Sequence, residues 1–532
     1  MSTPLTSSPI DSVWNDAVPN IQAVGHARDG APPAGEALSA VGELVEQDRA
    51  TPPNGDWKTD VLIMGAGITG LTAALELLRR GRKVVVCEAR WVGAGTSAMS
   101  TGHLDAAPEC GAMSLIERFG EMRARQLISL RTSAIDWIET NTCESADFCR
   151  VSGFVFTEDE AGETSLRREQ VALNDLGLET AWHNRIGLPR ARSGIEIRHL
   201  GRMNSREHVL FLAEQVRQQG GQIWEHAPVA TPQEKNQDSV KVGDATVRFQ
   251  QFIAAGGANM ASSLRVHLQA PAYQSYVLAV RTEVEIADAL FWDDQSPYHY
   301  VRRVRSDDPN WLIVGGADHR TGMGHPEQSL DSLREYVADR YPGEITHSWS
   351  AQFYDNADGV PIIGRVPGRE QQFLATGFSG TGLTWGTAAG RVLADLIEGK
   401  PVASADALDP SRIITSGLGS LAVEQTKSAM SMVGYVTPDH SVDPEDLDVG
   451  EGRIGKVNGE EVAVCRDSDG CIHRRSAVCT HMGGRLSWNP VEQTWDCPLH
   501  GGRFAADGRR LYGPPREDMH DAGGSDRPAK PR

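Results

Sequence analysis

Lysine is scarce in this chain, and positive charge as a whole is outnumbered. Only eight of the 52 basic residues are lysines, and 71 Asp and Glu residues give a formal net charge of −19. Nucleic acids and anionic membrane surfaces attract proteins through basic patches. The charge balance therefore argues against both as partners.

Long apolar runs and export signals are also missing. No segment approaches the roughly 20 apolar residues that a membrane helix needs. The first residues contain neither a basic segment leading into an apolar one nor a twin arginine. The eight cysteines follow no disulfide framework, as is typical of a reducing compartment. We therefore expect a cytoplasmic protein without a membrane anchor.

The chain is too long for a single core, and its 532 residues predict two or three domains. Residues 1–56 are rich in Pro, Gly, Ala, Ser and acids without sustained apolar periodicity, so we expect a flexible arm there. The Ser-, Ala- and Gly-bearing stretch 408–433 predicts a linker. The polar residues 517–532 predict a flexible tail.

Two Cys and two His residues form the most informative pattern. Cys479-Thr-His481 and Cys497-Pro-Leu-His500 are separated by fifteen residues. Such a set can hold a [2Fe–2S] cluster, with both thiolates on one iron and both imidazoles on the other. Tetrahedral zinc is the alternative, since two Cys and two His also suit that ion.

The residues around both pairs favour the cluster. A Gly pair follows each Cys/His pair, and Gly513-Pro514-Pro515 comes shortly after, as a third loop that would shield the site. Cys479-Thr-His-Met-Gly and Cys497-Pro-Leu-His-Gly are similar to the two ligand loops of a Rieske domain. The resemblance implies a [2Fe–2S] cofactor with Cys479, His481, Cys497 and His500 as ligands.

The resemblance also implies a partner, a one-electron carrier such as a ferredoxin or cytochrome. Rieske proteins of respiratory chains join their loops by an extra disulfide, but the corresponding positions here are Gly484 and Leu499. The chain is therefore more similar to the ferredoxin-like Rieske group, which implies a lower reduction potential.

A dinucleotide fingerprint lies in the first half. An apolar strand pattern at Thr59–Met64 leads into Gly65-Ala-Gly67-Ile-Thr-Gly70, a helical run follows, and a second strand ends at Glu88. The first glycine makes the turn, the second lets the backbone approach a pyrophosphate, and the third lets helix and strand pack closely. Glu88 is placed to accept hydrogen bonds from a ribose.

Four later segments favour FAD as the nucleotide. Trp91–His103 is rich in small residues and suits a wrapping loop, Ala227-Pro-Val229 and Gln251–Ala258 follow strand patterns, and Leu374–Thr384 opens an amphipathic helix. Together with Asp358-Gly-Val-Pro-Ile-Ile-Gly364, these segments resemble the D-amino-acid oxidase/sarcosine oxidase superfamily. The resemblance implies these FAD-binding residues: Gly65, Gly67, Ile68, Thr69, Gly70, Glu88, Ala89, Arg90, Gly95, Thr96, Ser97, Gly102, His103, Val229, Gly256, Gly257, Gly377, Gly380, Thr381, Gly382, Leu383 and Thr384.

The two resemblances imply an α/β fold with a separate all-β domain. A glutathione-reductase-type FAD domain carries an inserted, mostly antiparallel substrate sheet, and the Rieske domain follows. The expected boundaries are FAD segments at 57–145, 201–264 and 346–407, substrate segments at 146–200 and 265–345, and the Rieske domain at 434–516.

A strand in the substrate segments carries candidate catalytic residues. In Tyr298-His-Tyr-Val-Arg302 a period of two places Tyr298, Tyr300 and Arg302 on one face. That face could bind a carboxylate or a polar amine, or it could be an ordinary amphipathic strand. His103, at the end of the wrapping loop, and Trp385 are further candidates, and a structural role is open for each.

The combination predicts an oxidoreductase. A substrate gives a flavin two electrons, whereas a [2Fe–2S] cluster accepts one at a time, and the chain has no second nucleotide fingerprint for NAD(P)H. No lysine lies between Lys241 and Lys400, where sarcosine-oxidase-like members carry an oxygen-activating lysine. We therefore expect oxidation of a C–N bond in a small amine, amino acid or N-methylated compound, with electrons leaving through the cluster. Two alternatives stay open, a ferredoxin-fed monooxygenase or reductase and a non-catalytic electron carrier.

Overall fold

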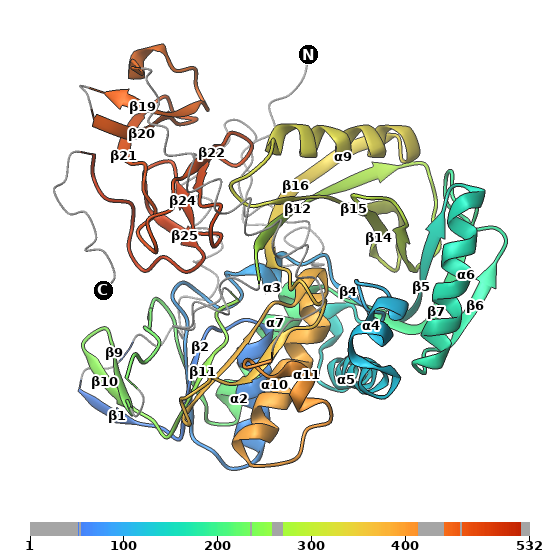
Figure 1. Ribbon diagram of the computed structural model, residues 1–532, viewed down its shortest axis with the longest axis horizontal. Helices are drawn as coiled ribbons and strands as arrows, with labels where there is room; N and C mark the ends of the chain where they lie inside the picture. Colours follow the sequence, from blue (N-terminus) through green and yellow to red (C-terminus); the bar gives the residue numbers. More distant parts are fainter. Residues whose placement is uncertain are drawn as a thin grey trace.

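The computed structural model describes residues 52, 55–234, 237–257, 270–412, 441–457 and 460–522. Three units are visible in Figure 1. We name them the nucleotide unit, built on a six-stranded sheet, the nine-stranded sheet with its helices, and the C-terminal unit, residues 441–457 and 460–522. The predicted linker lies largely outside the described residues, as does almost all of the predicted N-terminal arm.

The nucleotide unit is built on buried strands. β2 and β3 carry the continuous apolar sequences that parallel strands covered on both faces require. Only β17, at one edge, runs antiparallel to its neighbour. The order of the sheet is β17 (Ile362–Arg365), β18 (Gln372–Thr376), β11 (Gln251–Ala254), β2 (Val61–Met64), β3 (Val84–Cys87) and β8 (Gln222–Trp224).

Helices α2 (Ile68–Arg79), α7 (Ser205–Gln218) and α10 (Gly382–Ile397) pack against this sheet. α7 begins where the Asn204 side chain accepts a hydrogen bond from the Glu207 N–H at 3.2 Å. A small sheet of β1 (Asp56–Lys58), β10 (Ala245–Arg248) and β9 (Ser239–Val242) extends the unit. The short helix α11 (Ala405–Leu408) ends it.

The nine-stranded sheet is antiparallel except where β13 pairs with β5. Its order is β16 (Gly343–Tyr354), β12 (Ala272–Thr282), β15 (Asp308–Arg320), β14 (His299–Arg305), β13 (Leu290–Asp293), β5 (Cys149–Thr157), β7 (Ser193–Arg202) and β4 (His103–Leu104), with β6 (Thr180–His183) also on β7. The helices around it are α3 (Thr96–Met99), α4 (Ala112–Phe119), α5 (Glu121–Thr140), α6 (Glu160–Asp175) and α9 (Pro326–Arg340).

The nine-stranded sheet extends beyond the boundaries that the sequence predicts for the substrate segments. β16 pairs along β12 from Thr282 to Ala272, so it belongs wholly to this sheet, whereas the predicted boundary at 345/346 cuts through it. β4, from the predicted FAD segment, pairs with the end of β7. Chain position alone does not reveal these pairings, because backbone hydrogen bonding determines them.

The C-terminal unit consists of two small antiparallel sheets. One contains β19 (Gly452–Val457), β20 (Glu460–Arg466) and β21 (Ile472–Ser476), and the other contains β22 (Ser487–Asn489), β23 (Thr494–Asp496), β24 (Arg503–Ala505) and β25 (Arg510–Tyr512). The sequence Gly455-Lys-Val-Asn-Gly-Glu-Glu-Val-Ala-Val-Cys465 predicts a hairpin, and β19 and β20 pair antiparallel as the prediction requires. The Asn-Gly turn itself lies outside the described residues.

The predicted flexible tail begins too early. Met519 is buried in the core of the C-terminal unit, and its N–H donates to the Gly508 carbonyl at 2.8 Å. Asp521 pairs with Arg475. The buried methionine side chain therefore holds residues 517–522 on the C-terminal unit, although the composition of this segment is mostly polar.

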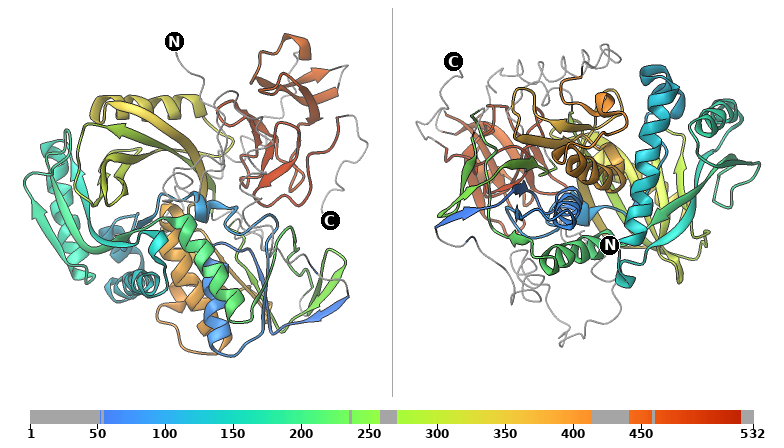
Figure 2. Two further views of the ribbon diagram at one scale, coloured as in Figure 1. Left: turned by 180° about the vertical axis from the view of Figure 1, so that it is seen from behind. Right: turned by 90° about the horizontal axis from the view of Figure 1, so that it is seen from below.

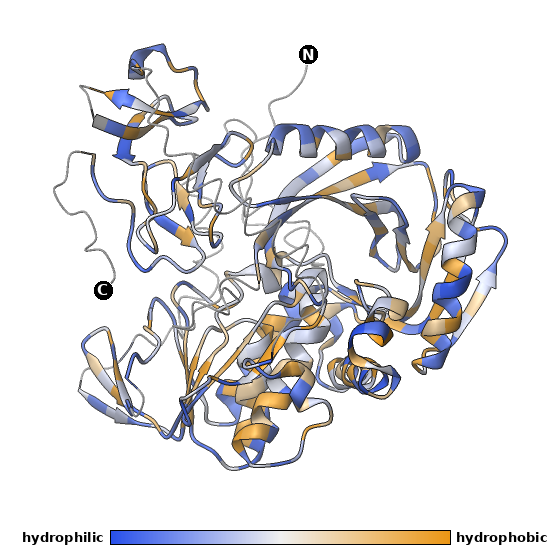
Figure 3. Ribbon diagram, viewed as in Figure 1, coloured by the Kyte–Doolittle hydropathy of each residue, from blue (hydrophilic) through white to orange (hydrophobic). Residues whose placement is uncertain are grey.

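Apolar side chains concentrate between the six-stranded sheet and its helices, as the orange colour of Figure 3 shows. Figure 2 shows the C-terminal unit beside the nine-stranded sheet when the molecule is seen from behind. In the part of the chain that the structure describes, no helix combines the length and apolar character of a membrane span.

A buried ion-pair network stabilises the C-terminal unit. Arg503 donates to Glu492 at 2.8 Å and to Asp496 at 3.1 Å, and all three side chains are nearly inaccessible to solvent. Burying a charge is costly unless opposite charges and hydrogen bonds accompany it. Arg503 therefore compensates two carboxylates at once.

The variant Arg503→Ala tests this network. Two uncompensated buried carboxylates are expected to destabilise the C-terminal unit by about 3–5 kcal/mol. Hydrogen–deuterium exchange of the peptides spanning 452–512 measures the loss. The control is Arg453→Ala, whose guanidinium pairs with Glu451 while 55% exposed and is expected to contribute less than about 1 kcal/mol. Equal exchange in the two variants would contradict the assignment.

Candidate functional site

A cavity of about 1170 Å³ lies between the nucleotide unit, the nine-stranded sheet and the C-terminal unit. It opens against the carboxyl ends of the parallel strands, where α/β sheets bind ligands. Most of the predicted FAD-binding residues line it: Gly65, Gly67, Ile68, Thr69, Glu88, Ala89, Arg90, Gly95, Thr96, Ser97, His103, Val229, Gly256, Gly257, Gly377, Gly380, Thr381, Gly382 and Leu383. We call the part near Glu88 the nucleotide end.

Three predicted FAD-binding residues do not line the cavity. A Cβ on Gly70 would lie 2.0 Å from the Gly65 carbonyl oxygen, so this glycine permits close packing of α2, as the fingerprint predicts. A Cβ on Gly102 would lie 1.9 Å from the Met203 carbonyl oxygen. Thr384 is fully buried within α10. Packing, not contact with a ligand, accounts for these three positions.

The nucleotide end is arranged around the start of α2. Its N-cap is Gly67, which has no capping side chain, so N–H groups of the first turn are available to an anion. The Ile68 N–H donates to Ser97 Oγ at 3.1 Å. The Glu88 carboxylate accepts from the Ala66 and Arg90 N–H groups, each at 3.0 Å. These residues fit a dinucleotide.

The opposite part of the cavity, which we call the substrate end, is lined by aromatic side chains. The His103 ring lies 5.1 Å from the Tyr300 ring and 5.5 Å from the Trp292 ring, measured between centroids. Tyr298 lies 6.2 Å from Tyr300. Burial, with the charge of Arg302 as the second cause, lowers the pKa of His103, so the imidazole is neutral.

Arg302 does not reach the cavity, and its predicted contact with substrate is wrong. The side chain is fully buried and donates to the carbonyls of Thr101 at 2.7 Å, Arg303 at 2.7 Å and Met203 at 3.1 Å. Burial lowers its pKa to about 9. The period of two identified the correct face, but here the guanidinium anchors the backbone leading to His103.

Trp385 is also a structural residue. It lies in the main hydrophobic core with 4% of its surface exposed. The Arg131 guanidinium stacks over its ring at 5.3 Å. The indole packs away from the cavity because this side of α10 faces the core, so the predicted contact with substrate is not made.

Sequence reasoning missed an acidic group at the substrate end. Glu109 lines the cavity and accepts a hydrogen bond from the Gly380 N–H. Burial, and then the nearby Asp355, raise the pKa of Glu109 to about 8. Behind Tyr298 lies Asp318, whose pKa is raised by burial to about 6. Glu109 follows a proline in a loop without a motif, so no local signal marks it.

The two Cys/His segments form loops with the same backbone bonding. The Cys479 N–H donates to the Gly484 carbonyl at 2.8 Å, and the Gly483 N–H donates to the Cys479 carbonyl at 3.1 Å. The Cys497 loop repeats both bonds, at 2.7 and 3.0 Å. Gly483 and its counterpart Gly501 have φ of 75° and 71°, a conformation that glycine adopts readily.

The four predicted ligands meet as two pairs. Cys479 and Cys497 are buried and share a hydrogen bond, which raises the pKa of Cys479 and lowers that of Cys497. The His481 and His500 rings lie 5.2 Å apart. Nowhere in the described chain do three or more His, Cys, Asp or Glu side chains converge on one ion position. Two pairs suit a binuclear cluster better than a single zinc ion.

Glycines complete the cradle for the cluster. A Cβ on Gly484 would lie 2.9 Å from Cys497 Sγ, and a Cβ on Gly502 would lie 2.6 Å from the Pro515 ring. The predicted third loop therefore packs on the second ligand loop. His500 is 8% exposed, whereas His481 is half-buried and its neighbour Met482 is 43% exposed.

The C-terminal unit is docked on strand β16. Gln352 Nε2 donates to the Gly501 carbonyl at 3.0 Å, and the Tyr354 hydroxyl donates to the His500 carbonyl at 3.4 Å. Ser350, on the same strand, and Gln274, on β12, donate to Glu492. The second ligand loop is thus fixed to a strand that also lines the cavity.

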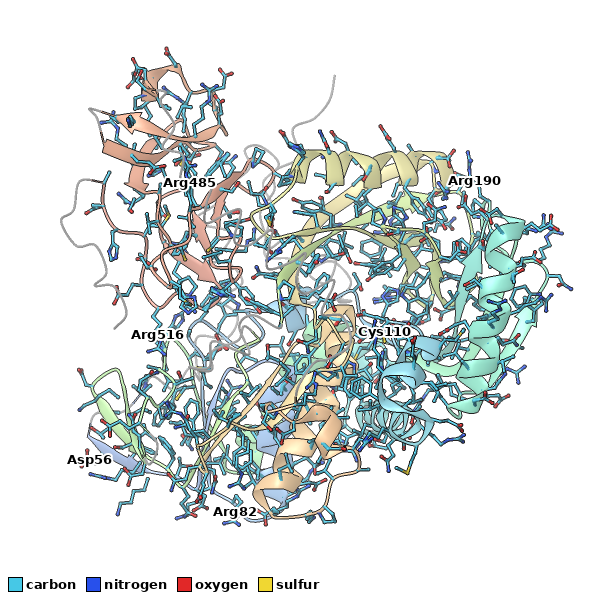
Figure 4. The ribbon with its side chains drawn as sticks, in the orientation of Figure 1. Asp56, Arg82, Cys110, Arg190, Arg485 and Arg516 are labelled. Carbon is cyan, nitrogen blue, oxygen red and sulfur yellow. The ribbon has the colours of Figure 1, made fainter. Side chains whose placement is uncertain are left out.

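The C-terminal unit also forms part of the cavity wall. Tyr512 lines the nucleotide end, with its hydroxyl 3.4 Å from Thr96 Oγ1. Arg516, labelled in Figure 4 where the two units meet, donates to Thr231 Oγ1 at 3.0 Å. The two candidate sites therefore share a wall, which the sequence did not reveal.

Comparisons with known proteins agree with this architecture. Residues 60–396 match the family model of FAD dependent oxidoreductases (DAO), and residues 440–521 match that of the Rieske [2Fe-2S] domain. A Bacillus subtilis protein whose name describes a Rieske 2Fe-2S iron–sulfur protein, YhfW, is 28% identical over 86% of this chain and 92% of its own.

Two solved structures share the fold of the first two units. Glycine oxidase from Geobacillus kaustophilus superposes with a TM-score of 0.58 at 20% identity, covering 67% of this chain and 100% of that one. L-proline dehydrogenase from P. horikoshii gives 0.57 at 18% identity, covering 67% and 98%. The match of the DAO model, the cavity and the paired ligand loops lead to one conclusion: the chain belongs to the FAD dependent oxidoreductase family and carries a C-terminal Rieske [2Fe–2S] domain.

Proposed function

We propose that the protein oxidises a C–N bond of a small amine-type compound and passes the electrons through its cluster to a one-electron carrier. Bound FAD supplies a two-electron acceptor, and the cluster supplies a one-electron centre. The names of two similar structures, glycine oxidase and L-proline dehydrogenase, describe oxidation of amino compounds. Both names support a small amine-type compound as the substrate.

The residues of this chain bind and orient. We propose that the lining residues of the nucleotide end hold FAD and that Cys479, His481, Cys497 and His500 hold the cluster. The aromatic side chains and neutral His103 enclose the substrate end, which excludes water and restricts the orientation of a bound molecule. Tyr298 donates a hydrogen bond to Asp318, which fixes the direction of its hydroxyl.

The observation that carries the proposal is strand β16. Ala351–Tyr354 line the cavity, and Gln352 and Tyr354 hydrogen-bond the loop that contains Cys497 and His500. The site of substrate oxidation and the one-electron centre are therefore joined by direct contacts. An arrangement of this kind favours electron transfer within one chain over transfer between separate molecules.

The difference in exposure between the two imidazoles supports a direction of electron transfer, from the cavity through the cluster to a carrier. His500 is buried against β16, whereas His481 and Met482 are accessible to solvent. We propose that the carrier docks beside His481. None of the eight cysteines forms a disulfide in the structure, in accord with a proposed cytoplasmic location.

A test of the FAD site replaces Gly67 by valine. A Cβ at this position would already lie 2.9 Å from Ser97 Oγ, and the two methyl groups would occupy the space of the nucleotide. The purified variant is expected to lack FAD in its absorbance spectrum. Gly187→Val is the control, because nothing lies within 4 Å of a Cβ there. Full flavin content in the Gly67 variant would place the site elsewhere.

A test of the cluster replaces His481 by alanine. Wild-type protein is expected to contain about two irons and two labile sulfides per chain, and the variant neither, with FAD retained. The neighbouring Met482→Ala variant keeps the ligand set and is expected to keep the metal. Stoichiometric zinc without labile sulfide would refute the ligand assignment.

The order of electron transfer is tested by anaerobic stopped flow with a panel of amines and amino acids. Flavin absorbance is expected to fall first and cluster absorbance to change afterwards. His481→Ala should keep the first phase, lose the second and still turn over with an artificial flavin oxidant. Peroxide formation that equals substrate consumption, and that the variant leaves unchanged, would instead show an oxidase. Absence of flavin bleaching with every compound would refute C–N oxidation.

A further inference from the structure

The substrate end of the cavity is strongly acidic. Among the described residues that line it there is no lysine or arginine, but there are five carboxylates: Asp105, Glu109, Glu169, Asp293 and Asp294. The arginines that line the cavity lie at the nucleotide end, where Arg90 and Arg510 interact with Glu88 and Arg516 bonds Thr231. Among the described lining residues, basic side chains therefore lie only at the nucleotide end, whereas five carboxyl groups line the substrate end.

The nearest buried guanidiniums are directed elsewhere. Arg302 donates to backbone carbonyls, and Arg131 donates to the Asp105 carbonyl at 3.0 Å while stacking on Trp385. Neither lines the cavity. Among the residues the structure describes, no guanidinium is thus presented to a carboxylate group of a substrate, which a bidentate arginine recognises best.

Four of the five carboxylates already have partners in the protein. Asp293 pairs with His299 at 2.9 Å, and Asp294 accepts from Thr157. Asp105 accepts from the Ala107 N–H at 2.7 Å, and Glu169 accepts from two N–H groups that begin α4. These contacts explain the four carboxylates as structural groups.

Glu109 is different. Its hydrogen bond comes from the Gly380 N–H, and the Arg131 guanidinium attracts it electrostatically, but no lysine or arginine within the described ranges forms a salt bridge with it. A Cβ placed on Gly380 would lie 2.5 Å from Glu109 Oε1 and 3.1 Å from the Tyr298 hydroxyl. The carboxylate and the phenol therefore lie side by side at the cavity wall.

The surrounding rings complement this charge. Tyr298, Tyr300 and Trp292 line the cavity, and the neutral His103 adds no positive charge. Aromatic faces attract cations, most strongly where water is excluded. A carboxylate that burial makes costly to ionise is stabilised when a cation binds beside it. An anion meets no positively charged side chain among the described residues that line this end.

We propose that the substrate is a cationic amine that lacks an α-carboxylate, and that Glu109 and the adjacent aromatic rings receive its positive charge. This inference rests on the proposed oxidation of a C–N bond and narrows its substrate class. The proposed substrate differs from the amino acids named in glycine oxidase and L-proline dehydrogenase. The carboxylate of an amino acid would lie beside the carboxyl groups of the cavity with no guanidinium to pair with it.

The charge preference is tested by calorimetry on oxidised, FAD-loaded protein. Tetramethylammonium, which cannot be oxidised at nitrogen, is expected to bind, and acetate is not. Glu109→Gln is expected to weaken tetramethylammonium binding about ten- to a hundredfold, because the variant removes the Coulombic attraction between the carboxylate and the cation. Glu169→Gln, the same substitution at a carboxylate occupied by α4, is expected to leave the binding unchanged. Tighter binding of acetate, or equal loss in both variants, would overturn the proposal.

Substrate class is tested by anaerobic flavin reduction with matched pairs: cadaverine and lysine, pyrrolidine and proline, N-methylethylamine and N-methylalanine. At least one amine is expected to reduce the flavin ten times faster or more than its carboxylated counterpart. Equal or faster reduction by the amino acids would overturn this inference and leave C–N oxidation standing. Reduction by none of the six, with tetramethylammonium still bound, would refute the proposed reaction while the charge preference stood.

Discussion

The hydrogen bonds between strand β16 and the second ligand loop are the contacts on which the combined function depends. The donors are the buried side chains of Gln352 and Tyr354, and the acceptors are the backbone carbonyls of Gly501 and His500. Glu492 reinforces them from within the C-terminal unit. Because the acceptors are backbone atoms of the ligand loop, the docking fixes the loop itself and not only the surface of the unit. These bonds hold the Rieske domain against the nine-stranded sheet.

The carboxyl groups around the cavity are costly to ionise, because burial removes the water that would solvate their charge. Burial raises the pKa of Glu109 and of Asp318, and the charge of the nearby Asp355 raises both further. N–H groups or other protein partners stabilise most of the carboxyl groups that line the substrate end. Glu109 is the one whose burial is least compensated. Perturbed groups of this kind concentrate at functional sites.

How much the sequence predicted depends on the range over which each signal acts. The ligand loops and the glycine fingerprint are local, so the sequence motifs and the resemblances they carry were enough to predict Cys479, His481 and Gly67 as site residues. The period of two placed Tyr298, Tyr300 and Arg302 on one face, but a face does not specify neighbours, and Arg302 meets carbonyls from two distant segments. Residues such as Glu109 and Tyr512 reach the site only through the tertiary fold. No local pattern distinguishes them from any other glutamate or tyrosine.

The position of Tyr512 constrains how the molecule is assembled. This side chain and Arg510 belong to the C-terminal unit but form part of the wall at the nucleotide end. A flavin that enters from that side must arrive before the C-terminal unit docks, and once docked the unit obstructs its departure. Flavin insertion before the C-terminal unit docks would avoid this obstruction. A neighbouring domain that contributes none of the fingerprint would then slow the release of the flavin.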